Sequence, residues 1–136
     1  MTQEENNLYY VCSLIEFLGR MTKNTNRTIV EILEKDELKR QIYLAPANHC
    51  LSFEEVAEEL VNELNIPFGD FDSVGNCRYT VPTVTSIGGV YRDLVLDVIK
   101  NSDDELEMVD VMYQVFISFM SDEISDFNTS VYLRES

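Results

Sequence analysis

Hydrophobic residues recur every three or four positions along most of this chain, which predicts helices rather than strands. The first helix should run from Leu8 to about Lys23. Two shorter helices follow, beginning near Thr28 and near Asp36. We expect Pro46 to end the second of them, because proline cannot donate to the helical hydrogen-bond ladder. The residues of that helix expected to face inward are Leu38, Ile42 and Tyr43.

The clearest helix start lies at Ser52. Ser52 and Glu55 have the spacing of a capping box, in which a serine hydroxyl accepts a hydrogen bond from a backbone N–H three residues further on. An apolar stripe runs from there to Leu64, and Asn65 and Pro67 should end the helix. Its solvent-facing side carries four glutamates, Glu54, Glu55, Glu58 and Glu59.

Residues 65–82 should form an irregular connection, because they contain two prolines, two glycines and two asparagines. Cys77, Tyr79 and Val81 alternate with polar residues, which favours a short extended segment. A lone strand has no partner inside this chain. We therefore expect a loop there, unless the segment pairs in a dimer or with another protein.

A long helix should then open at Thr83 or Thr85 and reach about Lys100. Gly88 and Gly89 inside it are unusual, because two glycines cost about 2 kcal/mol of helix propensity relative to alanine. We expect another helix or the loop to approach the backbone closely at this point.

Ser102 and Glu105 have capping-box spacing and predict one final helix that ends near Asp126. This helix has more methionine and aromatic residues than a single buried stripe requires. It is either a central helix buried on two sides or the surface of a homodimer or partner groove, since methionine-rich surfaces adapt to partners. The candidate partner-binding residues are Met112, Phe119, Asp122 and Glu123.

Together these elements predict an all-α protein, a single compact bundle of five to six helices. Residues 8–127 should form the domain, with a polar tail over 1–7 and a C-terminal tail over 128–136. The connection 65–82 is the one place where a short strand could form.

The charge of the chain is high and unevenly distributed. Its net charge is −15, and residues 51–136 carry eighteen acids and four bases, whereas residues 1–50 carry seven acids and six bases. Such a surface repels phosphate backbones, so we expect no nucleic acid as a partner and favour a basic protein or a purely solubilising role. The six bases of residues 20–40 could form a basic patch opposite the acidic body, allowing self-association or docking of a partner.

The three cysteines, Cys12, Cys50 and Cys77, form no CxxC pair and do not look like a secreted disulfide framework. The acidic N-terminus does not resemble a signal peptide, and no apolar run approaches the length of a membrane span. We therefore expect a reducing, cytoplasmic location and no membrane association.

His49, the single histidine, is the best candidate for chemistry. With Cys50 and Cys77 it offers three nitrogen and sulfur donors of the kind that zinc prefers. A Cys–His nucleophile pair is a further possibility if one of the cysteines lies beside it. Adjacent side chains diverge, however, so the ordinary interpretation is a histidine near a helix start and cysteines that act as small hydrophobic residues. We expect no catalytic residue, no cofactor and no bound metal.

The segments LYYVCSLIEFLGRMTKN, IVEILEK and IYLAPANHC, followed by an acidic helix, resemble a group of small uncharacterised bacterial proteins classed as a domain of unknown function. The resemblance covers residues 8–64 and includes the pair Ile15-Glu16 and a tyrosine, Tyr43, shortly before His49. It implies no activity. Members of the group resemble the products of small accessory genes, which sometimes lie next to genes for toxin-like ADP-ribosyltransferases. This resemblance implies a partner-binding or neutralising role.

The leading expectation is therefore a non-catalytic, antitoxin-like protein that binds another, basic protein, with a homodimer as a further possibility. The alternative is a small enzyme or metal-binding protein that uses His49 with Cys50 or Cys77.

Overall fold

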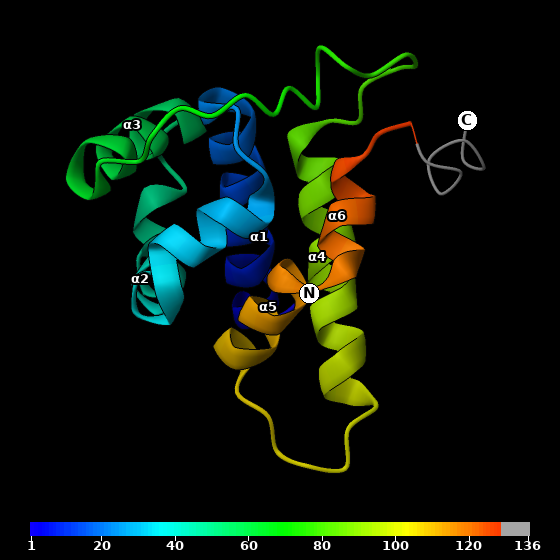
Figure 1. The fold of residues 1–136 in the computed structure, drawn as a ribbon. Coiled ribbons are helices and arrows are strands. Elements are labelled where there is room, and N and C mark those ends of the chain that lie inside the picture. Colours follow the sequence, from blue (N-terminus) through cyan, green and yellow to red (C-terminus); the bar gives the residue numbers. More distant parts are fainter. Residues whose placement is uncertain (129–136) are drawn as a thin grey trace.

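The computed structural model describes residues 1–128, in which six α-helices and no strand form a bundle (Figure 1). The predicted all-α fold is confirmed. The helices are α1 (Gln3–Thr22), α2 (Asn26–Asn48), α3 (Phe53–Leu64), α4 (Val84–Lys100), α5 (Met108–Ile117) and α6 (Phe119–Ser125). Apart from Asn128, the expected C-terminal tail lies outside the described residues.

Helix α1 lies in the middle of the bundle, between α4 on one side and α2 and α3 on the other (Figure 1). It begins at Gln3 rather than near Leu8, because the hydroxyl of Thr2 caps it by accepting a hydrogen bond from the N–H of Glu5 at 3.1 Å. Residues 3–7 of the expected polar tail are therefore helical and form about the first turn and a half of α1. Fully buried side chains of this helix include Leu8, Val11, Ile15 and Leu18.

Helix α2 bends sharply at Glu34, where the backbone leaves the helical region (φ 62°, ψ 171°). The bend separates the two short helices that the pattern predicts. The prediction that Pro46 ends the second one is wrong, because α2 continues beyond it. Pro46 lies near the helix end, so little of the ladder follows it, and the N–H of His49 still donates to the carbonyl of Ala45 at 2.9 Å.

The predicted inward face of this second half is partly wrong. Leu38 is fully buried and Ile42 is half-buried, but 83% of the surface of Tyr43 is exposed. The helical period explains the difference, because residues three and seven positions after Leu38 share its face. Gln41 and Ala45 occupy those positions and are buried.

Helix α3 begins as predicted. The hydroxyl of Ser52 accepts a hydrogen bond from the N–H of Glu55 at 3.1 Å and lies 3.3 Å from its carboxylate. Asn65 ends the helix in the left-handed conformation (φ 52°), which asparagine tolerates better than most residues. The four predicted glutamates are all exposed.

Replacing Ser52 by alanine should lower the free energy of unfolding by about 1 kcal/mol, because an N–H of the first turn loses its acceptor. Ser52→Asp is the matched control and should stay within a few tenths of a kcal/mol of the natural protein, since aspartate is also a good cap. Urea unfolding followed by circular dichroism measures both. Equal losses in the two variants would contradict the capping role.

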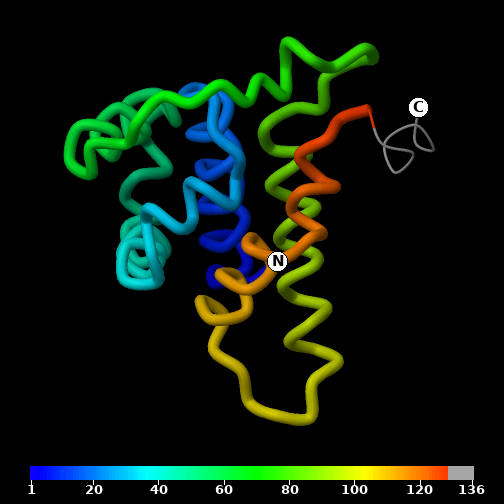
Figure 2. Tube along the Cα trace, viewed as in Figure 1, coloured from blue at the N-terminus to red at the C-terminus, as the bar shows by residue number. Residues whose placement is uncertain are grey.

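The connection 65–82 crosses the C-terminal end of α1 as an extended loop (Figure 2). Its backbone is held there by two hydrogen bonds of 2.9 Å, from Gly69 N–H to the carbonyl of Thr22 and from Phe71 N–H to that of Lys23. In the part of the chain that the structure describes, the alternating residues near its end form no strand. The loop interpretation is confirmed.

Helix α4 has Thr83 as its cap, the first of the two predicted starts. It packs against α1 through Gly88, where an added Cβ would lie 2.9 Å from the backbone nitrogen of Ser13 and even closer to its hydroxyl. The expected close approach is therefore confirmed at Gly88. Gly89 differs, because the atom nearest to its added Cβ is 3.7 Å away, on the side chain of Arg92.

The prediction of one final helix from Ser102 is wrong. The hydroxyl of Ser102 accepts a hydrogen bond from the N–H of Asp104 at 3.1 Å, which closes a turn instead of opening a helix. A second break follows at Ser118, whose backbone is extended (φ −81°, ψ 167°) and separates α5 from α6. The carbonyl of Val115 closes the end of α5 by accepting two hydrogen bonds from Ser118, from its backbone N–H at 3.2 Å and from its hydroxyl at 2.7 Å.

Candidate functional site

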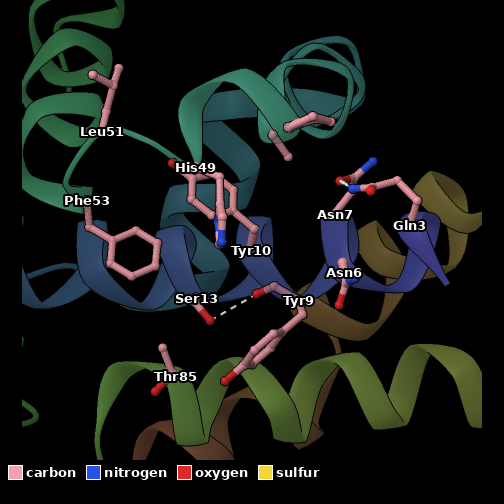
Figure 3. Close-up of a pocket in the computed structure, with 12 residues that line it drawn as sticks. Gln3, Asn6, Asn7, Tyr9, Tyr10, Ser13, His49, Leu51, Phe53 and Thr85 are labelled. Atoms are coloured by element: carbon pink, nitrogen blue, oxygen red, sulfur yellow. Dashed lines mark hydrogen bonds between the residues drawn. The ribbon is translucent and has the colours of Figure 1, made fainter. Parts of the chain in front are cut away.

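A cavity of about 610 Å³ opens between α1, the end of α2 and the start of α4 (Figure 3). Helix α1 supplies half of the lining residues, because side chains three or four positions apart share one helix face. Toward the N-terminus this face carries amides, and toward the middle of the helix it carries Tyr10 and Ser13 (Figure 3). The amides are those of Gln3, Asn6 and Asn7.

Aromatic rings form one side of the cavity. The ring of Tyr10 lies 5.4 Å from that of Phe53 in a stacked arrangement and 5.8 Å from that of His49 in an edge-on arrangement. The hydroxyl of Tyr10 donates to the carbonyl of Asn48 at 3.4 Å, and burial raises the pKa of this phenol. These contacts fix His49 at the rim, although it follows the last residue of α2 and is itself exposed.

The polar groups of the cavity retain free hydrogen-bonding capacity. The amide of Gln3 donates to the side-chain oxygen of Asn7 at 2.8 Å, which leaves the oxygen of the first and the NH₂ of the second available. Within residues 1–128, neither the amide of Asn6 nor the ring of His49 has a hydrogen-bond partner. None of the twelve described lining residues is an Asp, Glu, Lys or Arg, although these make up 26% of the chain.

The structure does not bring the three candidate metal ligands together. Among the described residues, no group of three or more His, Cys, Asp or Glu side chains is arranged to hold a metal ion. Cys50 is exposed beside His49, whereas Cys77 lies in the connection, where its thiol donates to the carbonyl of Tyr79 at 3.2 Å. Cys12 is fully buried, and the loss of solvent raises the pKa of its thiol strongly, which disfavours a thiolate nucleophile.

A buried polar network lies on the other side of α1. Glu16 is 3% exposed, and its carboxylate accepts hydrogen bonds from Arg20 at 2.6 Å and from the amide of Asn26 at 2.8 Å. The same amide donates to the hydroxyl of Tyr91 at 3.3 Å, and that hydroxyl lies 2.8 Å from the hydroxyl of Ser121. Burial raises the pKa of Tyr91 to about 12. The network joins α1, α2, α4 and α6, so its role is structural.

The bases of residues 20–40 do not form a basic patch. Each of the six has an acid of the same chain within 4.0 Å, so none of them stands as an unpaired positive charge among the described residues. The pairs are Arg20–Glu16, Lys23–Asp72, Arg27–Asp122, Lys35–Asp110, Lys39–Glu107 and Arg40–Glu37. Four of the six acids come from the second half of the chain: Asp72, Glu107, Asp110 and Asp122. The hypothesis of a basic patch opposite an acidic body is wrong.

The four candidate partner-binding residues fall into different environments. Met112 is fully buried, so it offers no surface to a partner, and α5 is covered on more than one side, because Val111 and Val115 are buried as well. Phe119 is 70% exposed at the start of α6. Glu123 is also exposed, whereas the carboxylate of Asp122 pairs with Arg27 at 2.9 Å.

Sequence reasoning missed the amides of the cavity because the first residues of the chain read as a polar tail. A signal was present. Gln3, Asn6, Asn7 and Tyr10 recur at helical spacing, and Thr2 is a good cap three residues before Glu5. Polar residues at helical spacing indicate a buried or ligand-facing side only when another element packs over them. The sequence pattern does not predict that the end of α2 packs against α1.

Within residues 1–128 no helix combines the length and the apolar character needed to cross a bilayer. Comparison of the chain with protein families, with curated proteins and with solved structures found no match.

Proposed function

We propose that this protein is a non-catalytic binding protein that recognises a basic surface of another protein, in an accessory, antitoxin-like role. The observation that carries the proposal is the distribution of ion pairs. The bases of residues 20–40 are occupied by internal partners. In the described chain the four glutamates Glu54, Glu55, Glu58 and Glu59 have no ion-pair partner and are exposed.

The glutamates form a row on a rigid element. Positions four apart on a helix lie one above the other, so Glu54 aligns with Glu58 and Glu55 with Glu59. Their mutual repulsion persists in the free protein and falls when a cationic surface covers them. Because exposed charges interact over about 8 Å at physiological ionic strength, the row would raise the rate of encounter with such a surface.

An exposed aromatic residue borders the acidic row. Arg40 of α2 reaches the carboxylate of Glu63 on α3 at 3.8 Å, so the outer face of α2 adjoins the outer face of α3. Tyr43 lies on that face of α2, one turn after Arg40, with 83% of its surface exposed. Tyrosine is enriched among the residues that dominate binding energy at protein interfaces, so we assign Tyr43 as the anchor. Phe119, beside Glu123 on α6, is the second candidate anchor.

Neutralising the acidic row should weaken partner binding at least tenfold at low salt and much less at high salt, because steering by exposed charges is screened. The variant replaces Glu54, Glu55, Glu58 and Glu59 by glutamine, which keeps a capping residue at position 55. Capture from a lysate of the native organism identifies the retained protein, and surface plasmon resonance with the purified partner gives the rates.

The matched control neutralises four exposed acids at the opposite end of the bundle, in and beside the loop 101–107 (Figure 1). These acids are Asp97, Asp103, Asp104 and Glu105. Both variants change the net charge equally, so equal effects would mean that total charge matters and that α3 is not the docking surface. Tyr43→Ala and Phe119→Ala then separate the two anchors, since the true anchor should raise the dissociation rate. Unchanged partner binding by His49→Ala separates this function from the enzyme or metal-protein alternative.

A further inference from the structure

We infer that the cavity between α1, α2 and α4 is a binding site for an uncharged purine of the adenine type, free or as its nucleoside. This inference is independent of the proposed partner binding, because the cavity shares no residue with the acidic row or with either candidate anchor. It rests on the volume of the cavity, on the chemistry of its lining and on unoccupied hydrogen-bonding groups.

The volume suits a small organic molecule. Sites for such ligands typically enclose about 300–1,000 Å³ and combine apolar walls with a few polar groups. The cavity encloses about 610 Å³, and its lining combines aromatic and aliphatic residues with neutral amides and hydroxyls. Several helices contribute to it, so it is formed by the packing of the fold rather than by one loop.

The charge of the surroundings selects against anions. The described lining contains no lysine or arginine that could neutralise a phosphate, and the whole chain carries a net charge of −15. Arg92 lies nearby over the ring of Tyr9, 4.8 Å from its centroid, but its guanidinium is already paired with Asp93 at 2.9 Å. A cation would likewise find no carboxylate in the lining. The cavity therefore favours a neutral ligand.

The rings and amides together match a purine. Tyr10, His49 and Phe53 offer a wall on which a flat ring can pack, and offset or edge-on aromatic contacts are favourable (Figure 3). Asparagine and glutamine amides pair with the edge of adenine, accepting from its exocyclic amine and donating to a ring nitrogen. Asn6 has both groups unoccupied by the described protein residues, and Gln3 and Asn7 keep one each.

Isothermal titration of the full-length protein with adenosine tests the inference. We expect saturable binding with one site per chain, little dependence on salt concentration, and weaker binding of adenosine monophosphate because its phosphate enters an anionic field. Asn6→Ala and His49→Ala should each weaken binding about five- to tenfold, the loss expected for one hydrogen bond or one ring contact. Both side chains are exposed, so both variants should fold.

Asn62→Ala, on the exposed face of α3 and away from the cavity, is the control and should bind adenosine as the natural protein does. Absence of saturable binding by both adenosine and adenine would overturn the inference. If adenosine binds both Asn6→Ala and His49→Ala as tightly as it binds the natural protein, the ligand site lies outside this cavity. If adenosine monophosphate binds more tightly than adenosine, the inference of an uncharged ligand is overturned. Asn6→Ala should bind the partner protein normally if purine binding and partner binding are separate functions. The failure of one proposal can therefore be distinguished from the failure of the other.

Discussion

Replacing Gly88 by alanine should lower the free energy of unfolding by about 2–3 kcal/mol, the cost of overfilling a tightly packed interior. The added methyl group would press on the hydroxyl, Cα and backbone nitrogen of Ser13. Ser13 has little room to yield, because its hydroxyl donates to the carbonyl of Tyr9 at 2.9 Å and the residue is 1% exposed. Helix α4 must therefore move away from α1 and lose contacts along their shared length. Guanidinium unfolding at constant temperature measures the change.

Gly89→Ala is the matched control, one residue further along the same helix. Its methyl group would meet ordinary van der Waals distances of 3.7 and 3.8 Å, to Arg92 and to Tyr9. Because alanine is a better helix former than glycine, this variant should be more stable than the natural protein by about 0.5–1 kcal/mol. Changes of opposite sign in the free energy of unfolding at these two adjacent positions would separate the effect of packing from that of helix propensity. Equal changes in the two variants would contradict the close approach at Gly88.

Removing the carboxylate of Glu16 should cost about 3 kcal/mol. In Glu16→Ala the guanidinium of Arg20 and the amide of Asn26 lose their shared acceptor inside the protein, and a broken buried pair leaves an uncompensated charge. Lys35→Ala is the control, because Lys35 and Asp110 form an exposed pair whose loss should change stability by no more than about 0.5 kcal/mol. Urea unfolding of both variants measures the difference. Similar small losses would mean that solvent reaches the network freely.

The same residue gives stability a pH dependence of definite sign. Burial raises the pKa of Glu16, and the opposing hydrogen bonds from Asn26 and Arg20 only partly compensate. The folded protein therefore keeps a proton on Glu16 at pH values where the unfolded chain, with a pKa of about 4.3, has lost it. Stability from this group is fully present below the unfolded pKa and is lost as pH rises through the raised folded pKa.

Glu16→Gln has no proton to lose, so the stability of the natural protein minus that of the variant should fall as pH rises above about 4.3 and then level off. Unfolding by urea at a series of pH values measures this difference. Taking the difference cancels the contribution of the other acids. A difference that increases with pH would mean that the pair with Arg20 outweighs the burial of the carboxylate.

Patterns that depend on neighbouring residues were readable from the sequence. Ser52, Thr83 and Asn65 mark helix ends through hydrogen bonds or backbone angles set within a few residues, and all three are where the pattern placed them. The glycine pair at 88–89 indicated a close approach of another element, because glycine inside a helix is destabilising unless its lack of a side chain is used in packing. The all-α class followed from the sum of such local signals.

Features decided by contacts across the fold were not readable. Ser102 has the same capping spacing as Ser52, yet its hydroxyl closes a turn with Asp104. The sequence pattern placed Met112 either on a partner surface or in a helix buried on two sides, and the packing of α5 against α2 and α4 decides for the second. Four of the six ion pairs of the bases at 20–40 join residues far apart in the sequence, up to 95 positions between Arg27 and Asp122, so no local pattern could reveal those four. The cavity depends in the same way on the approach of α2 to α1.

The central position of α1 has a consequence for synthesis on the ribosome. Helix α1 is made first, but α4, which covers one of its sides, begins only at Val84. At a translation rate of about 5–20 residues per second, the intervening chain takes on the order of several seconds to emerge. Throughout that interval the nascent chain holds a strongly apolar helix that α2 and α3 can shield on one side only. We therefore expect the newborn protein to be most exposed to aggregation and chaperone capture before α4 has emerged to cover the other side of α1.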